Sequence, residues 1–153
     1  MSSSQGHIGC RVLLVDDSAL NRKMMNRLLT RKGYTCYEAE DGTDAVDMVA
    51  ASIAPSSTLS YDLIIMDNIM PKLSGPLATT SIRTMGYIGV VIGVTGNALP
   101  EDINEFRSHG ADAVLSKPLD LSDFETTLRG LNSIDTARAS PAITQEDFLS
   151  PIK

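Results

Sequence analysis

Residues 11–18 read Arg-Val-Leu-Leu-Val-Asp-Asp-Ser, an aliphatic run that ends abruptly in two carboxylates and a hydroxyl. A continuous run of Val and Leu is typical of a strand buried on both faces. Ser18 offers a side-chain oxygen that can begin a helix, and Gly33 can end it. Between them an apolar stripe recurs at helical spacing, formed by Leu20, Met24 and Leu28 with the neighbouring Met25 and Leu29. The sequence therefore predicts a strand followed by an amphipathic helix.

The same alternation of a short aliphatic run and a longer periodic segment recurs four more times. The expected strands cover residues 34–39, 63–66, 88–94 and 113–115, and the expected helices 42–53, 76–85, 100–109 and 121–131. Residues 54–60, with Pro55 and three serines, indicate a surface loop. Strands that alternate with helices form parallel sheets covered on both faces. We therefore predict an α/β fold with a five-stranded, doubly wound parallel sheet.

Length and composition favour one globular domain with an aliphatic core. The chain has 153 residues, of which 42% are hydrophobic, 21% are charged and only 5% are aromatic. We expect a flexible leader over residues 1–9, the domain over residues 10–131, and a disordered tail over residues 132–153, where the periodicity stops.

Charge and cysteine content exclude several classes of function. The net charge is −6 without a basic run, which argues against nucleic-acid binding. Cys10 and Cys36 lack metal-ligand spacing, so we expect reduced thiols in the cytoplasm or the nucleus. We find no signal peptide and no apolar stretch near the ~20 residues of a membrane span, so no membrane partner is expected.

Polar side chains follow four of the five expected strands. Asp16 and Asp17 follow the first, Asp67 the third, Thr95 the fourth and Lys117 the fifth. Ligands of open parallel sheets bind beyond the carboxyl ends of the strands, so these side chains mark a candidate site. Taken singly, each could be a helix cap, a turn residue or a solvated charge.

Three carboxylates at neighbouring strand ends repel one another, so a cation or raised pKa values must offset their charge. Oxygen ligands around an open site suit Mg²⁺ together with phosphate oxygens. A lysine opposite such a metal is suited to a transferring phosphoryl group. A carboxylate can be the covalent nucleophile, although the residue types alone leave open which carboxylate is attacked.

Four segments together resemble the response-regulator receiver family, often called CheY-like, over roughly residues 10–131. They are Val15-Asp16-Asp17-Ser18, Met66-Asp67-Asn68-Ile69-Met70-Pro71 with Gly75, Val94-Thr95-Gly96-Asn97-Ala98, and Ser116-Lys117-Pro118-Leu119. The resemblance implies the flavodoxin-like (βα)5 fold with strand order 2-1-3-4-5. It also implies a phosphorelay function, in which the domain takes a phosphoryl group from a phosphohistidine and then switches conformation or passes the group on.

The resemblance assigns a role to each matching position. Asp67 would be the phosphoacceptor, Lys117 its counter-ion, and Thr95 the hydroxyl that moves to the phosphoryl group. Gly96 would leave the phosphoryl group accessible, and the Lys117–Pro118 bond is expected to be cis. Mg²⁺, or Mn²⁺, would be bound by Asp17, Asp67 and the backbone carbonyl of Ile69, and through water by Asp16.

Two positions depart from the family's pattern. Val114 stands three residues before the lysine, where the family commonly has Tyr or Phe, so a rotating aromatic switch is not expected. Ile69 stands two residues after the acceptor, where a polar side chain could position water. We therefore expect slow hydrolysis of the aspartyl phosphate.

The implied partner is a histidine kinase or a histidine phosphotransfer protein, and we expect a monomer that catalyses only its own phosphorylation and dephosphorylation. The expected docking face comprises Leu20, Asn21, Met24, Pro118 and Leu119. A haloacid-dehalogenase-like phosphatase is the main alternative, but Asp16 and Asp17 are adjacent rather than in an Asp-x-Asp signature. A flavodoxin-like cofactor binder would have a flavin phosphate facing the same two carboxylates, and a degenerate receiver scaffold would not need the complete acidic set.

Overall fold

The computed structural model describes residues 9–139, with side chains through Asn132. The chain divides after Leu119 into two compact units, and each is described by itself. The first unit contains β1 (Arg11–Val15), α1 (Ala19–Arg31), β2 (Thr35–Ala39), α2 (Gly42–Ser52), β3 (Leu63–Asp67), α3 (Gly75–Thr84), β4 (Val90–Thr95), α4 (Pro100–Ser108) and β5 (Ala113–Ser116). The second contains α5 (Leu121–Ala139).

The five strands form one parallel sheet in the order β2-β1-β3-β4-β5, as the sequence predicts. The central strand β3 is buried at all five positions, which explains its continuous aliphatic run. The fourth strand begins at Val90 rather than at Ile88, whose side chain is 96% exposed. Asp67 pairs in register with Val94, so the end of β3 lies beside the end of β4.

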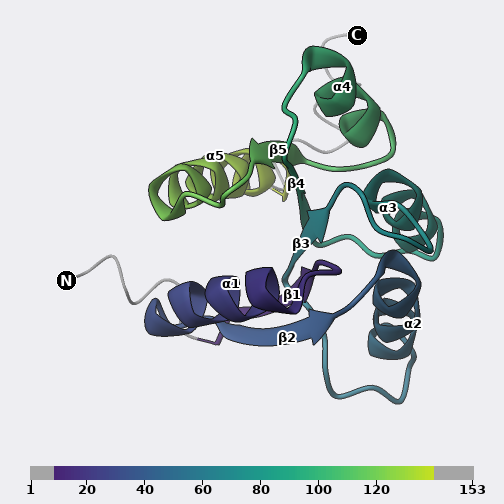
Figure 1. Cartoon of the computed structure of the whole chain (residues 1–153). Coiled ribbons are helices and arrows are strands. Elements are labelled where there is room, and N and C mark those ends of the chain that lie inside the picture. The colour runs from purple at the N-terminus through teal and green to yellow at the C-terminus, as the bar shows by residue number, and fades with distance from the viewer. Residues whose placement is uncertain (1–8, 140–153) are drawn as a thin grey trace, which may run out of the picture. The chain divides into compact units, whose positions relative to one another are not determined.

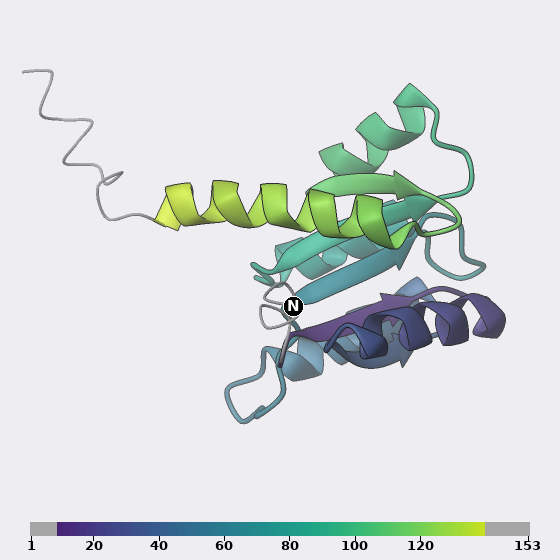
Figure 2. The same cartoon turned by 90° about the vertical axis from the view of Figure 1, so that its left-hand side faces the viewer.

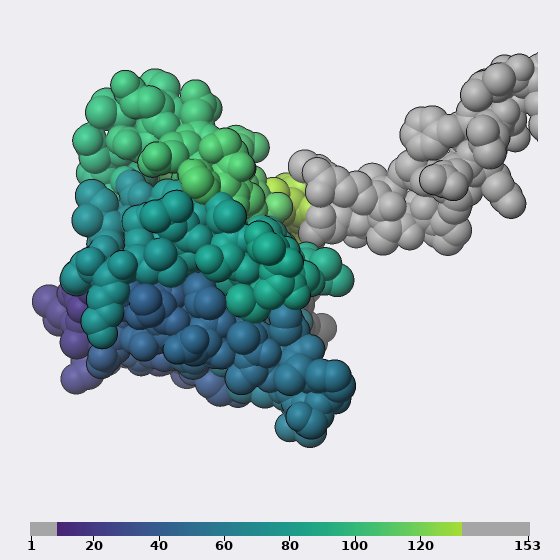
Figure 3. Space-filling view, turned by 90° about the vertical axis from the view of Figure 1, so that its right-hand side faces the viewer, coloured from purple at the N-terminus to yellow at the C-terminus, as the bar shows by residue number. Residues whose placement is uncertain are grey.

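Within the first unit, α1 lies on one face of the sheet and α2, α3 and α4 on the other (Figure 1). Figure 3 shows the face covered by α2, α3 and α4. The core cluster joins alternate residues of β1 and β3 to the inward sides of these helices; among its members are Leu13, Val15, Ile64, Met66, Ala45, Val49, Ala78, Ile82 and Phe106. This packing fixes the strand ends that carry the polar side chains.

The apolar stripe predicted for α1 is only partly buried. Met25 and Leu29 are buried, but Leu20 and Met24 are 67% and 54% exposed. The third residue on the buried side is Arg22, whose guanidinium donates to the carbonyl of Asp16 at 2.7 Å. Hydrophobic periodicity cannot identify a buried arginine, because its burial depends on acceptors supplied by other elements.

The last helix extends further than the sequence analysis predicts. Helix α5 continues to Ala139, whereas the sequence analysis ends the expected helix at residue 131. No Gly or Pro interrupts this segment before Pro141, and Ala and Arg favour the helix. The backbone N–H of Asp123 donates to Asp120 Oδ1 at 2.9 Å where the helix begins. The expected leader, apart from Gly9, and the tail from residue 140 lie outside the described residues.

The helices of residues 9–139 do not have membrane-spanning character. None of them combines the length and the apolar composition that crossing a membrane requires (Figure 2 shows the helices from the side).

Candidate functional site

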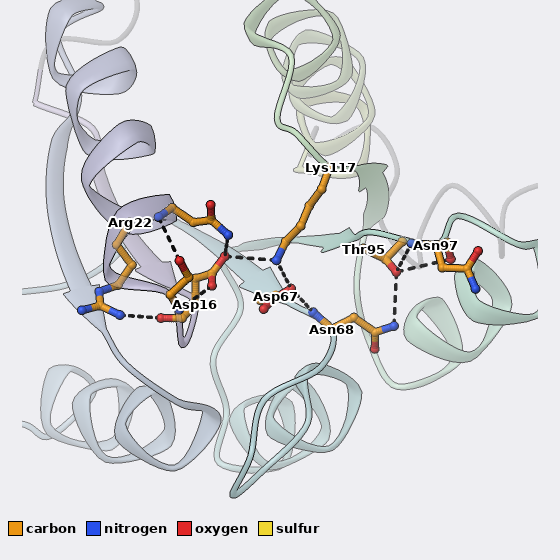
Figure 4. Close-up of polar contacts among 9 residues, drawn as sticks. Asp16, Arg22, Asp67, Asn68, Thr95, Asn97 and Lys117 are labelled. Atoms are coloured by element: carbon orange, nitrogen blue, oxygen red, sulfur yellow. Dashed lines mark hydrogen bonds and ion pairs between the residues drawn. The ribbon is translucent and has the colours of Figure 1, made fainter.

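Four of the polar side chains predicted from the strand ends, those of Asp16, Asp67, Thr95 and Lys117, meet at one edge of the sheet (Figure 4). Carboxylate oxygens of Asp16, Asp17 and Asp67 all lie within 4.8 Å of one another. Lys117 reaches this cluster from the end of β5, with its Nζ 2.8 Å from Asp67 Oδ1 and 3.3 Å from Asp16 Oδ2. The Lys117–Pro118 peptide bond is cis, as expected. The structure therefore brings together three carboxylates and one cation.

Burial and the neighbouring charges shift the pKa values of Asp67 and Lys117. Burial raises the pKa of Asp67 above its ordinary value, and the hydrogen bond from Lys117 lowers it only in part while the Asp16 carboxylate raises it further. Burial alone would lower the pKa of Lys117, but its hydrogen bond and ion pair with Asp67 raise it. Lys117 is therefore held as a cation beside a carboxylate that is costly to ionise.

Asp16 is fixed by the residues that begin α1. Its side chain accepts hydrogen bonds from the backbone N–H of Ser18 at 2.8 Å and from Asn21 Nδ2 at 3.4 Å. Asp16 is 1% exposed, whereas Asp17 beside it is exposed to solvent. One lysine does not neutralise three carboxylates, and their oxygen ligands suit a hard divalent cation. The donor set therefore fits a metal ion such as Mg²⁺.

Thr95 faces the same site from the end of β4, and its hydroxyl is engaged by two asparagines. Asn68 Nδ2 donates to Thr95 Oγ1 at 3.3 Å, and the backbone N–H of Asn97 donates to it at 3.2 Å. The hydroxyl itself donates to the carbonyl of Asn97 at 3.3 Å. Gly96 next to it is exposed, and a Cβ added there would meet nothing within 4 Å. Space for an incoming group is thus available beside Thr95.

Ile69 and Asn97 border a hollow of about 380 Å³ that also includes Asp17, Asp67, Thr95, Gly96 and Lys117. The Ile69 side chain is 78% exposed. The role of its backbone carbonyl as a metal ligand stays a prediction. Val114 is partly buried against the core, so β5 carries an aliphatic side chain where the family's aromatic residue is expected.

Asp41 is a supporting residue that the sequence analysis missed. It is 5% exposed and follows Glu40 at the end of β2, where no polar group was assigned to the site. Its carboxylate accepts hydrogen bonds from the backbone N–H groups of Lys72 and Leu73, both at 3.0 Å. The loop after Asp67 is therefore tied to the beginning of α2. The Glu-Asp-Gly sequence after a strand was the available signal.

Comparison with known proteins shows that the chain matches the model of one protein family. The family model described as the response regulator receiver domain matches residues 12–129. Two-component response regulator ORR41 of Oryza sativa subsp. japonica is 40% identical over 111 residues, which cover 71% of this chain and 84% of that protein. Sensor histidine kinase RcsC of Escherichia coli K12 is 36% identical over 117 residues, 76% of this chain. The match spans only 12% of that kinase's length.

A solved structure is also similar to this chain. It is the receiver domain of the histidine kinase CKI1 from Arabidopsis thaliana complexed with Mg²⁺, at 27% identity and a TM-score of 0.74. The match covers 86% of this chain and 97% of that one.

Proposed function

Because the chain belongs to the response regulator receiver family and is a receiver domain of a two-component phosphorelay, we propose that Asp67 accepts a phosphoryl group from a phosphohistidine. The observation that carries this proposal is the position of Lys117 Nζ, 2.8 Å from Asp67 Oδ1 and within reach of Asp16. Asp67 is the one carboxylate of the three that ends the central strand, and it lines the hollow together with Asp17, Thr95 and Gly96.

The proposed reaction transfers the phosphoryl group between two side chains. A carboxylate oxygen of Asp67 forms a bond to phosphorus while the bond between phosphorus and the donor's imidazole nitrogen breaks. The donor's imidazole ring, which carries a proton on its other nitrogen, leaves with that electron pair as neutral imidazole. Lys117 stabilises charge on the phosphoryl oxygens, and Thr95 then donates its hydroxyl to one of them. The same residues catalyse only this transfer and the later hydrolysis of the aspartyl phosphate.

Asp16, Asp17, Asp67 and the Ile69 carbonyl would hold a Mg²⁺ or Mn²⁺ ion. When bound, that ion would neutralise the carboxylates and the phosphoryl oxygens during transfer. The chain's own contribution is to hold the three carboxylates within 4.8 Å and to keep Asp16 oriented through Ser18. The CKI1 receiver complexed with Mg²⁺ supports this assignment by similarity.

The phosphohistidine donor is proposed to be a histidine kinase or a histidine phosphotransfer protein that docks beside α1. A groove of about 240 Å³ lies there, lined by residues that include Asn21, Met24, Leu28, Pro118 and Leu119. Leu20 and Met24 expose apolar side chains beside it. An apolar helix of the partner can cover them while its histidine reaches Asp67.

Incubation with Mg²⁺ and acetyl phosphate or phosphoramidate, followed by intact-mass measurement, tests the acceptor. We expect one added phosphoryl group in the wild type and in Thr95→Ala, and none in Asp67→Asn. Undiminished labelling of Asp67→Asn would overturn the proposal. The haloacid-dehalogenase-like alternative has no support from the geometry, because the adjacent Asp16 and Asp17 do not form the signature of that family.

A further inference from the structure

The hydroxyl of Thr95 has no remaining capacity for a new hydrogen bond. A hydroxyl can donate one hydrogen bond and accept two. Thr95 Oγ1 donates to the Asn97 carbonyl and accepts from the Asn97 N–H and from Asn68 Nδ2, at 3.2 to 3.3 Å. Thr95 is 2% exposed, so water does not compete for these positions. Before this hydroxyl can donate to a phosphoryl oxygen, it must release the Asn97 carbonyl, and movement of the side chain toward the phosphoryl group also takes it away from Asn68 Nδ2.

Asn68 is held rigidly where it reaches Thr95. Asp67 pairs in register with Val94. The residues that come next in the two chain segments, Asn68 and Thr95, therefore lie opposite each other. The backbone N–H of Asn68 donates to the carbonyl of Val94 at 3.0 Å and to Asp67 Oδ1 at 2.9 Å. Its carbonyl accepts from the N–H of Gly75 at 2.7 Å. An anchored backbone positions the side-chain amide at little entropic cost.

We propose that Asn68 is a positioning residue that holds Thr95 in the orientation of the unphosphorylated state. The inference rests on the proposed function, because it concerns the movement of Thr95 toward a phosphoryl group on Asp67. In the unphosphorylated state the Asn68 amide donates to the Thr95 hydroxyl and so stabilises the position in which this hydroxyl also bonds to the Asn97 backbone. In the phosphorylated state that stabilisation is lost, so Asn68 opposes the switch.

The free energy by which Asn68 opposes the switch can be bounded from its hydrogen bond to Thr95. A neutral hydrogen bond contributes about 0.5–1.5 kcal/mol net, which corresponds to roughly two- to tenfold in an equilibrium constant. The distance of 3.3 Å is at the long end for such a bond, which favours the lower part of this range. Asn68 therefore adjusts the switching equilibrium without abolishing it. Ile69 and Asn97 border the same hollow, but neither side chain has this contact to Thr95.

A double-mutant cycle with beryllofluoride and Mg²⁺ tests the inference. Beryllofluoride is a phosphoryl analogue, and its affinity is measured by calorimetric or NMR titration for the wild type, Asn68→Ala, Thr95→Ala and the double variant. We expect Asn68→Ala to bind beryllofluoride about two- to tenfold more tightly than the wild type. The same substitution in the Thr95→Ala background should change the affinity by less than about twofold, because no hydroxyl remains to be held.

Asn68→Leu, which keeps the shape of the side chain but removes its donor, provides a second variant if Asn68→Ala does not fold. Asn104→Ala, at an exposed position of α4, is the matched control and should leave the affinity unchanged. Mg²⁺ affinity without beryllofluoride, which a general structural disturbance would lower, should equal that of the wild type.

Unchanged or weaker beryllofluoride binding by both Asn68 variants would overturn the inference, as would an equal gain with and without Thr95. If the proposed function itself is wrong, the result differs: wild type and Asp67→Asn then bind beryllofluoride equally or not at all.

Discussion

Lys117 forms its ion pair with Asp67 across an intervening strand. Lys117 follows β5 and Asp67 ends β3, and β4 lies between these two strands in the sheet. The backbone N–H of Lys117 donates to the carbonyl of Thr95 at 2.8 Å, which fixes the lysine beside the end of β4. From there its Nζ reaches Asp67 Oδ1 at 2.8 Å. The ends of β3, β4 and β5 thus meet around this ion pair.

Replacement of Lys117 by Met should slow phosphorylation of Asp67 by about 10²-fold, because one preorganised cation that stabilises developing charge is lost. The rate of labelling by acetyl phosphate, followed by intact-mass measurement, gives the effect. Lys72→Met is the matched control, since Lys72 is an exposed lysine of the neighbouring β3–α3 loop. Equal rates for the two variants would contradict the role of Lys117.

The hydrogen bonds to Asp41 should make its contribution to the free energy of unfolding depend on pH. Burial alone would raise its pKa, but the backbone N–H groups of Lys72, Thr43, Leu73 and Gly42 that donate to it lower the pKa below its ordinary value of 3.8. A lowered folded-state pKa means that the ionised carboxylate stabilises the fold above pH 3.8, and that this contribution is lost as the pH falls through the folded-state value.

We therefore expect Asp41→Asn to lower the free energy of unfolding by about 1–3 kcal/mol at pH 7. Urea unfolding at pH 7 and near pH 2–3 measures the difference between wild type and variant, which should shrink at the acid pH. Asp47→Asn, at an exposed position of the same helix, should change stability little at either pH. A difference of the same size at both pH values would show that Asp41 acts through packing.

The space at Gly93, in the middle of β4, is too small for a larger side chain. A Cβ added at Gly93 would lie 2.7 to 2.8 Å from three ring carbons of Phe106, which is fully buried beneath it. Gly93→Ala should therefore lower the free energy of unfolding by about 1–3 kcal/mol. Gly96→Ala, where a Cβ meets nothing within 4 Å, should not. Adding Phe106→Leu should restore part of the loss; urea unfolding that shows no recovery would place the strain elsewhere.

The sequence predicted the strands and the polar strand ends well because both depend on local patterns. The aliphatic runs before Asp16 and Asp67 identify buried parallel strands without any knowledge of their neighbours. The topology then requires the carboxyl ends to meet at one edge. The family resemblance supplied the strand order, which the structure confirms.

What the sequence could not predict depends on partners from elsewhere in the fold. Arg22 looks like a surface residue of α1, but its guanidinium donates hydrogen bonds to the Asp16 carbonyl and to the Glu38 carboxylate. Asp41 looks like a simple helix cap, yet it also holds the loop at Lys72. The contact of Asn68 with Thr95 depends on the register of β3 and β4, which no local pattern encodes.

Ile69 predicts a long-lived aspartyl phosphate. Its side chain is 78% exposed at the edge of the hollow beside Asp67 and offers no hydrogen bond to a hydrolytic water. Ile69→Asn should accelerate loss of the phosphoryl group by roughly two- to tenfold, the effect of one added hydrogen bond. Leu77→Asn, at an exposed position of α3, is the control. Decay of the labelled protein is followed by mass, and an unaltered half-life in Ile69→Asn would refute the effect.

Substitution of Met24 should weaken docking of the partner without affecting the phosphorylation chemistry at Asp67. Its side chain is 54% exposed and lines the groove beside Pro118, whereas it contributes no atom to the carboxylate cluster. Met24→Glu should therefore weaken phosphoryl transfer from a phosphorylated histidine phosphotransfer protein by at least about tenfold, a loss of roughly 1.4 kcal/mol typical of a buried interface residue. Labelling by acetyl phosphate should be unchanged, because that small donor needs no docking face. Ile88→Glu, at a 96% exposed apolar position before β4, controls for added charge. If Met24→Glu and Ile88→Glu slow protein-dependent transfer equally, the partner docks on another face of the domain.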